Sequence, residues 1–266
     1  MSDVTITVAI DGTNRVHSLW HAMHDAAAVA KQFVRDLGTL VDGTRAAHVV
    51  VAFDSPRCFR RDVDAQYKLN RAAKEQGLVD ALQRSLEHAS RGYPCYQIDG
   101  FEADDLLASA ARQCVLRSLP GRSGVSHKCV IVSPDKDLRQ CLSPGRVTIM
   151  TGWAGSGVRF APAWMSHAHF ESSYGFSPLR WIDYQCLVGD PHDNIVGADG
   201  IGEVTAAKIV QATERLEEIF ANRWLVKLQE KQWRGLKSLE PRLPIVRQLV
   251  TLRTDIVLQE VSDVVG

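Results

Sequence analysis

Three features that place many sequences in a class are missing here: an excess of charge of one sign, closely spaced cysteines and a long apolar run. The 31 Lys and Arg residues balance 31 Asp and Glu residues, which argues against a simple polyanion binder. The six cysteines lie at least 12 positions apart, which excludes CxxC motifs and a disulfide-framed secreted domain. No run of about 18 apolar residues and no signal-peptide pattern occurs. We therefore expect a cytoplasmic protein with reduced thiols and no membrane partner.

Of the 266 residues, 45% are apolar, which is enough to build a substantial core. The net charge is zero, but the charged residues are strongly segregated along the sequence. Residues 57–74 carry six basic and two acidic residues, and residues 222–247 carry seven basic and two acidic residues. Residues 183–203 carry five acidic residues and neither Lys nor Arg. This segregation indicates acidic pockets for metal ions beside basic surfaces for an anionic partner.

Short runs rich in β-branched residues alternate with helical patterns in the first part of the chain. Buried strands are predicted over residues 4–10, 46–53, 94–98 and 130–133. Helices are predicted over residues 17–37 and 102–116, with a short helix after Asp137. This alternation predicts an α/β fold with a mostly parallel central sheet flanked by helices on both faces.

After about residue 160 the pattern changes to helices alone. They are predicted over residues 161–174, 178–188, 205–212 and 214–221, and the basic remainder is also helical. We therefore expect an α/β part over residues 1–160 and a helical part over residues 161–266.

Acidic residues follow the predicted strands, with Asp11, Asp54, Asp99 and Asp135 at or just beyond their ends. The carboxyl ends of parallel strands meet at one edge of a sheet, where ligands bind, so these acids should gather there. Nine carboxylates along the chain are candidate ligands: Asp11, Asp54, Glu102, Asp104, Asp105, Asp135, Asp137, Asp190 and Asp193.

Carboxylates that share one edge repel one another unless a cation lies between them. Hard divalent cations with oxygen ligands, Mg²⁺ or Mn²⁺, are the natural neutralisers. For Glu102, Asp104 and Asp105 alone, capping of the following helix is an equally good explanation. The acids at three other strand ends favour metal binding over that alternative.

Seven short motifs, in this order along residues 4–260, carry a resemblance to a known family. They are Asp11-Gly12, Phe53-Asp54, Tyr67-Lys68-x-x-Arg71, Gly100-x-Glu102-Ala103-Asp104-Asp105, Ser133-x-Asp135-Lys136-Asp137-Leu138, Gly189-Asp190-x-x-Asp193-Asn194 and Gly197-x-x-Gly200-Ile201-Gly202. The ordered set resembles the structure-specific 5′ nucleases. These include the flap endonucleases, the phage 5′ exonucleases and the 5′→3′ exonuclease domain of bacterial DNA polymerase I.

The resemblance implies a PIN-like core and hydrolysis of phosphodiester bonds with two metal ions, Mg²⁺ or Mn²⁺. Such a pair lowers the pKa of a bound water and clamps the attacking and leaving oxygens. By similarity, the first ion is held by Asp11, Asp54, Glu102 and Asp104. The second is surrounded by Asp105, Asp135, Asp137, Asp190 and Asp193.

The basic segment near residues 56–90 corresponds to the helical arch that covers the site in this family. The resemblance implies that Lys68 stabilises charge on the scissile phosphate, with Arg71 assisting. It also implies that Tyr67 stacks on the terminal base. A solvated basic helix without a catalytic role is the alternative for this segment.

Residues 186–212 resemble a helix-hairpin-helix element. The backbone N–H groups of Gly200, Ile201 and Gly202, with Thr205 in the following helix, are expected to grip a DNA phosphate without reading bases. In this family the hairpin also holds K⁺ through main-chain carbonyls. The matching positions here are Leu187, Val188, Val196, Ala198 and Ile201.

The implied partner is DNA with a 5′ end, a flap or a nick, or an RNA primer on DNA, in replication or repair. We expect a stand-alone monomer. The sequence leaves open the preferred substrate, the balance of exonuclease and endonuclease activity, and a partnership with a separate DNA polymerase.

Three positions depart from the family pattern. Ser18 stands where the family usually has Arg on the first helix, and Arg15 lies one turn earlier. Val204 stands where a basic residue usually follows the hairpin, and His192 where Ser is common. These departures concern affinity for DNA, and none removes a candidate metal ligand.

Three other classes are less consistent with the residues. A phosphatase of the haloacid-dehalogenase type needs a nucleophilic Asp where this chain has Ala9. A PIN-type ribonuclease does not explain the hairpin or Asp190 and Asp193. A DNA-binding relative without turnover should lack several of the nine carboxylates.

Overall fold

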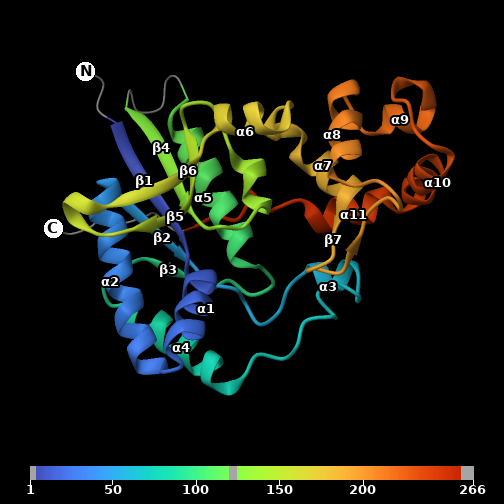
Figure 1. Ribbon diagram of the computed structural model, residues 1–266. Coiled ribbons are helices and arrows are strands. Elements are labelled where there is room, and N and C mark those ends of the chain that lie inside the picture. Colours follow the sequence, from blue (N-terminus) through green and yellow to red (C-terminus); the bar gives the residue numbers. More distant parts are fainter. Residues whose placement is uncertain (1–3, 120–124, 259–266) are drawn as a thin grey trace. The chain divides into compact units, whose positions relative to one another are not determined.

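The computed structural model describes residues 4–119 and 125–258, and the chain divides into two compact units (Figure 1). The first unit is formed by Met1–Cys58, Ala73–His167 and Arg253–Gly266. The second is formed by Phe59–Ala72 and Ala168–Leu252. Both units are therefore assembled from segments that are distant in the sequence.

A six-stranded sheet forms the centre of the first unit, in the order β3-β2-β1-β4-β5-β6. Its strands are β1 (Val4–Asp11), β2 (His48–Ala52), β3 (Cys95–Tyr96), β4 (Ser126–Val132), β5 (Val147–Ala154) and β6 (Ala161–Met165). The first five strands are parallel, and only β6 is antiparallel to its neighbour. The predicted α/β fold with a mostly parallel sheet is confirmed.

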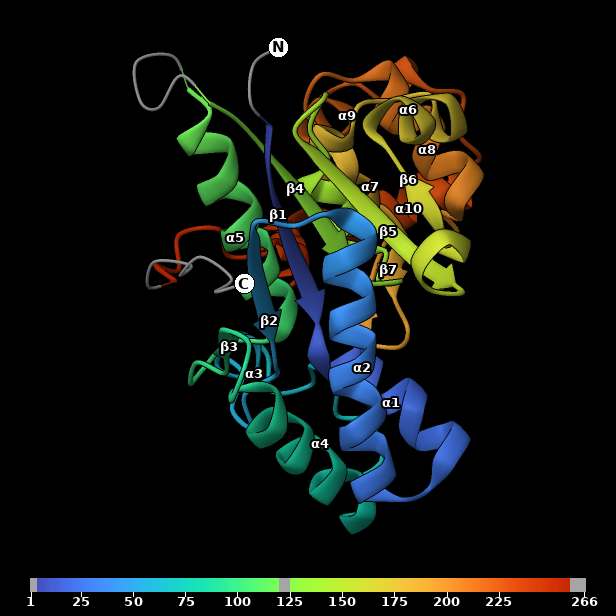
Figure 2. The same ribbon diagram turned by 90° about the vertical axis from the view of Figure 1, so that its left-hand side faces the viewer.

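Helices cover both faces of this sheet, so the inner parts of its central strands carry apolar residues on both faces. The helices of the unit are α1 (Gly12–Met23), α2 (Ala26–Thr44), α4 (Gln76–Ala89) and α5 (Ala103–Arg117), with a 3-10 turn, η1, over Asp137–Cys141 and another, η2, over Gly157–Arg159. Figure 2 shows α1, α2 and α4 on one face and α5 on the other. Val8, Ile10, Phe33 and Val51 are at most 1% exposed in the core beneath α2 and α4.

The single helix predicted over residues 17–37 is wrong, because two helices occupy this region. His24 ends α1 in the left-handed conformation (φ 49°), and the Asp25 carboxylate caps α2 by accepting from the amides of Ala27 and Ala28. The second helix also continues past Gly38 to Thr44, since packing against the sheet outweighs the low helix propensity of one glycine.

The helix predicted over residues 161–174 is wrong in its first part. Residues Ala161–Met165 form β6, which pairs with β5, a strand that the sequence analysis did not find. Pro162 is accommodated because β6 lies at the edge of the sheet, where a missing N–H is tolerated. The helix starts only at His167.

The second unit is helical apart from one short hairpin. Its elements are α3 (Arg60–Val63), α6 (His167–Tyr174), η3 (Pro178–Arg180), α7 (Trp181–Val188), β7 (Gly189–Asp190), β8 (Ile195–Val196), α8 (Glu203–Ala212), α9 (Glu217–Ala221), η4 (Arg223–Leu225), α10 (Glu230–Leu239), η5 (Glu240–Arg242) and α11 (Leu243–Val250). Trp181 stacks on Tyr184 and meets the edge of Phe170 in its core. The buried Arg60 guanidinium donates to the carbonyl oxygens of Leu249 and Thr251, which ties α3 to the end of α11.

In the part of the chain that the structure describes, no helix has the length and apolar character needed to cross a membrane.

Candidate metal centre and nucleic-acid contacts

Seven of the nine candidate carboxylates lie in the first unit, at the carboxyl edge of the sheet. We call them the acidic cluster: Asp11, Asp54, Glu102, Asp104, Asp105, Asp135 and Asp137. Asp11 is the last residue of β1, Asp54 follows β2, and Asp135 follows β4. Parallel strands that end at one edge place these side chains on the same side of the unit.

Asp11 is buried and held in one orientation by two donors. Its Oδ1 accepts from the amide of Asn14 at 2.8 Å, and its Oδ2 accepts from the Ser133 hydroxyl at 2.9 Å. Burial, reinforced by the negative charges of Asp54 and Asp135, raises the pKa of Asp11 from 3.8 to about 7. The protein thus holds a carboxylate in a place where its ionised form is poorly solvated.

Asp104, in the first turn of α5, is buried beside several other carboxylates of the cluster. Its pKa is raised well above the usual value by burial and then by the charges of Asp135, Asp11, Asp54 and Asp137. Five carboxylates therefore interact around one point. A divalent cation with oxygen ligands is the chemical group that relieves such repulsion.

Backbone contacts fix the remaining strand-end acids. Asp54 accepts from the amide of Ala103 at 2.9 Å, while its own amide donates to the Thr13 hydroxyl at 2.7 Å. The amide of Asp135 donates to the Ser133 hydroxyl at 3.1 Å, and the amide of Asp137 donates to the Asp135 carboxylate at 2.8 Å. Ser133 thus joins β1 to the loop after β4, a role that the sequence analysis missed although this serine stands in its motif.

Glu102 and Asp105 form a capping box at the start of α5, so the capping explanation is confirmed for this pair. The fully buried Asp105 accepts from the amide of Glu102 at 3.2 Å with Oδ2 and from the amide of Arg253 at 2.9 Å with Oδ1. Asp105 therefore joins α5 to the chain segment at Arg253. Sequence spacing gave no signal of that contact, because 148 positions separate the two residues.

The other two candidate carboxylates, Asp190 and Asp193, lie in the second unit around the β7–β8 turn, and both are buried. Asp190 accepts from the amide of His192 at 2.8 Å. Asp193 accepts from the Tyr67 hydroxyl at 3.1 Å and forms ion pairs with Lys68, at 3.5 Å, and with Arg71. The three predicted arch residues thus gather on one candidate ligand.

The backbone of the arch segment is also attached to this turn. The amide of Lys68 donates to the Asp193 carbonyl at 2.9 Å, and the Asn194 side chain donates to the Gln66 carbonyl at 2.8 Å. Lys68 and Asn194 have backbone φ values of 55° and 58°, a left-handed conformation that residues other than glycine adopt uncommonly. Tyr67 is 4% exposed, so its ring is covered in this arrangement.

The predicted hairpin follows α7 and leads into α8. The carbonyl of Leu187 accepts from the amide of Ala198 at 2.8 Å, and the carbonyl of Ala198 accepts from the amide of Ile201 at 3.1 Å. Gly200 has a φ of 72°, which favours glycine, and Gly202 caps α8.

Side chains of α10 lie against this hairpin. The Gln232 side chain donates to the Thr205 hydroxyl at 3.3 Å, and a Cβ atom at Gly200 would lie 3.7 Å from Cε of Lys231. Val204, where the family has a basic residue, is 71% exposed. The sequence analysis found no signal for this contact of α10 with the hairpin.

Arg15, one turn before Ser18 on α1, is engaged in contacts within the first unit. Its guanidinium pairs with Asp36 at 2.5 Å and stacks over the Trp153 ring at 4.7 Å. Arg15 therefore belongs to the packing of α1 on α2 and β5.

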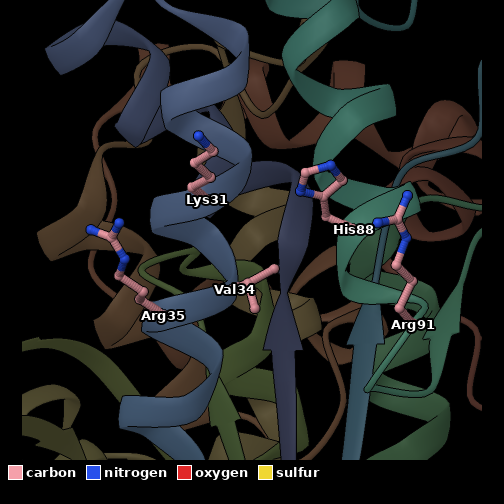
Figure 3. Close-up of a pocket in the computed structure, with 5 residues that line it drawn as sticks. All are labelled: Lys31, Val34, Arg35, His88 and Arg91. Atoms are coloured by element: carbon pink, nitrogen blue, oxygen red, sulfur yellow. The ribbon is translucent and has the colours of Figure 1, made fainter.

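A hollow of about 280 Å³ on the outer face of α2 and α4 is chemically unlike the acidic cluster (Figure 3). Its lining residues are Lys31, Val34, Arg35, His88 and Arg91. This lining contains no carboxylate, so the hollow is not a candidate metal centre.

Comparisons with known proteins identify the family of the chain. Residues 7–175 match the family described as 5′–3′ exonuclease, N-terminal resolvase-like domain. Residues 176–265 match the family described as 5′–3′ exonuclease, C-terminal SAM fold.

Curated relatives cover most of the chain. The thermostable DNA polymerase I of Thermus thermophilus is 34% identical over 215 residues, which are 79% of this chain and 23% of that protein. The chain thus spans less than a quarter of the length of that relative. Flap endonuclease Xni of Pectobacterium carotovorum is 28% identical over 254 residues, which are 94% of this chain and 85% of the relative.

Two solved structures show the same fold at low identity. The bacteriophage T5 5′-exonuclease with bound zinc has a TM-score of 0.74 at 20% identity, covering 93% of this chain and 89% of its own. The catalytic core of Rad2 with a DNA substrate has a TM-score of 0.58 at 15% identity, covering 99% and 82%. Together with the family matches over residues 7–265, these findings confirm the predicted resemblance: the chain belongs to the 5′–3′ exonuclease family.

Proposed function

We propose that this protein is a metal-dependent nuclease that hydrolyses phosphodiester bonds near DNA 5′ ends, as a 5′→3′ exonuclease and flap endonuclease. The observation that carries the proposal is the acidic cluster, in which burial and the charges of four neighbouring carboxylates raise the pKa of Asp104. An arrangement that is unfavourable without a cation is well suited to bind one. Membership of the 5′–3′ exonuclease family supports the same conclusion.

We propose Mg²⁺ or Mn²⁺ as the metal, with two ions. Asp11, Asp54, Glu102 and Asp104 would hold the first ion. Asp105, Asp135, Asp137, Asp190 and Asp193 would surround the second. The metal pair would supply an activated water and stabilise charge on the scissile phosphate.

The residues of this chain then act by positioning these ligands. The Ser133 hydroxyl and the Asn14 amide orient Asp11, and the Ala103 amide orients Asp54. Asp105 already accepts two backbone amides, so within the proposed second set its main contribution is to hold the start of α5 in place. Such fixed ligands reduce the reorganisation needed when metal and substrate bind.

Lys68 and Arg71 are the proposed cationic residues for the scissile phosphate. Their ion pairs with Asp193 show that both side chains reach a candidate ligand within the second unit. The rare backbone conformation of Lys68 supports a functional role, since strained residues cluster at active sites. Tyr67 is proposed to stack on a terminal base, a contact that requires its covered ring to become accessible.

The hairpin is proposed to bind the duplex part of the substrate through the amides of Gly200, Ile201 and Gly202, with Thr205 in the following helix. The K⁺ ion implied for the carbonyls of Leu187, Val188, Val196, Ala198 and Ile201 stays a prediction. The proposed partner is DNA with a 5′ end, flap or nick, or an RNA primer–DNA hybrid, bound by a monomer in the cytoplasm. A separate DNA polymerase is a proposed protein partner.

A cleavage assay on 5′-labelled flap, nicked, blunt and single-stranded DNA tests the function. We expect Mg²⁺-dependent release of short 5′ products from the flap and nicked substrates, and none in EDTA. Tight binding of all four substrates without hydrolysis would instead assign the protein to the DNA-binding class without turnover.

A further inference from the structure

We propose that Arg242 supplies, from within the chain, the positive charge that the family resemblance assigns to K⁺ at the hairpin. The inference rests on the proposed role of the hairpin in binding duplex DNA. It predicts that this protein binds DNA without a requirement for K⁺.

The Arg242 guanidinium reaches the hairpin with two nitrogens. Nη1 donates to the Val196 carbonyl at 3.2 Å and Nη2 donates to the Gly197 carbonyl at 3.1 Å, while Nε donates to the Ser238 carbonyl at 3.3 Å. Among residues 4–119 and 125–258, no carboxylate lies within 4.0 Å of this guanidinium to form an ion pair. Its charge is therefore directed at main-chain oxygens, the ligands that K⁺ takes in proteins.

The carbonyls implied for K⁺ are already engaged in part. Val196 accepts from Arg242, Leu187 accepts from the Ala198 amide, and Ala198 accepts from the Ile201 amide. Three of the five carbonyls implied for K⁺ thus already accept a hydrogen bond. One of these donors is the Arg242 guanidinium, a permanent cation that does not titrate in the physiological range. A second cation at the same carbonyls would face the repulsion of the guanidinium.

Close backbone packing keeps Arg242 in this position. A Cβ atom at Gly197 would lie 2.4 Å from the Leu187 carbonyl, and one at Gly235 would lie 1.9 Å from the Asp199 carbonyl. The first contact closes the hairpin on the end of α7, and the second presses α10 onto the hairpin. Because η5 follows α10 directly, the guanidinium is delivered to the carbonyls by a fixed support.

DNA affinity measured by fluorescence anisotropy, with flap DNA in Ca²⁺ to prevent turnover, tests the proposal. KCl and NaCl are compared at equal ionic strength. The wild-type affinity should differ less than about twofold between the two salts. For Arg242→Met, loss of charge-assisted hydrogen bonds should weaken binding in NaCl by about tenfold or more, with partial recovery in KCl.

Arg234→Met on α10 is the matched control, because the one side-chain interaction that Arg234 makes within the described residues is an exposed ion pair with Glu230 at 3.6 Å. It should change affinity equally and slightly in both salts. A preference of the wild type for KCl of about fivefold or more would overturn the proposal. So would an Arg242→Met variant that binds like the wild type, or one whose lost affinity KCl does not restore at all.

Thermal unfolding in the two salts separates this proposal from the proposed function. The wild type should show the same Tm in KCl and NaCl, and Arg242→Met should show a higher Tm in KCl, because an ion that binds the folded state stabilises it. A K⁺-specific rise in the wild-type Tm overturns the role of Arg242 even if the protein binds DNA well. Absence of DNA binding by the wild type contradicts the proposed function, whereas the Tm comparison still decides the role of Arg242.

Discussion

Replacing Asp104 or its neighbour Asp105 with Asn should change the stability of the metal-free protein in opposite directions. The Asp105 carboxylate is fully buried and accepts from the amides of Glu102 and Arg253. An Asn side chain keeps one oxygen and turns an NH₂ group toward the other amide. Loss of one hydrogen bond to a charged acceptor should lower the free energy of unfolding by about 1.5–3 kcal/mol.

Asp104→Asn should raise the free energy of unfolding instead. The Asp104 charge repels those of Asp135, Asp11, Asp54 and Asp137, and these interactions add to the cost of burial. A neutral amide of the same shape removes the repulsion and leaves the remaining carboxylates easier to ionise.

Urea unfolding at pH 8 in EDTA measures both effects, with Asp99→Asn as the matched control. Asp99 lies at the same edge of the sheet, but its side chain is 75% exposed. Its replacement should change the free energy of unfolding by less than about 0.5 kcal/mol. Shifts of the same sign for the Asp104 and Asp105 variants would refute this division between a repelling and a hydrogen-bonded carboxylate.

Three further predictions concern pH, the hairpin and the arch segment. In EDTA the free energy of unfolding should fall as pH rises from about 4 to about 7, because folded Asp11, with its pKa raised to about 7, keeps a proton that the unfolded chain has released. If urea titrations show that the free energy of unfolding rises over this window, the raised pKa of Asp11 is contradicted. Gly200→Val, at a φ of 72°, should weaken duplex binding by more than it slows single-turnover cleavage at saturating enzyme, and unchanged affinity would make the turn purely structural. Lys68→Ala should lower the rate of single-turnover cleavage at saturating enzyme by a factor of about 10²–10³, whereas Lys74→Ala should only weaken DNA binding slightly. Equal behaviour of the two variants would mean that Lys68 is a surface charge without a role in catalysis.

The parts of the fold that the sequence predicted are those specified by local patterns. The strand ending at Asp11 and the helix starting after Glu102 are marked by apolar runs and acidic residues a few positions apart. The gathering of their carboxylates followed from one topological rule, the common edge of parallel strands. The two family matches confirm the class of protein that these motifs predicted.

The parts that it did not predict depend on contacts between distant residues. The β5–β6 pair forms because two segments meet in the sheet. The second segment, Ala161–Met165, contains Pro162 and was predicted as the start of a helix. The contacts of Asp105 with Arg253, and of Arg242 with the hairpin, join residues at least 45 positions apart. No short-range pattern specifies such pairs, since they are fixed by packing of complete elements.

Single-turnover hydrolysis of a 5′-flap DNA in Mg²⁺ by the wild type, Asp135→Asn and Asp99→Asn tests the central claim most directly. Asp135 is one of the carboxylates that repel Asp104 within the acidic cluster, whereas Asp99 is an exposed acid at the same edge. Loss of a metal ligand removes several kcal/mol of transition-state stabilisation, about a thousandfold in rate. We predict that loss for Asp135→Asn, with flap binding in Ca²⁺ retained and with Asp99→Asn cleaving like the wild type. Cleavage by Asp135→Asn at the wild-type rate would contradict the assignment of the acidic cluster as the metal centre.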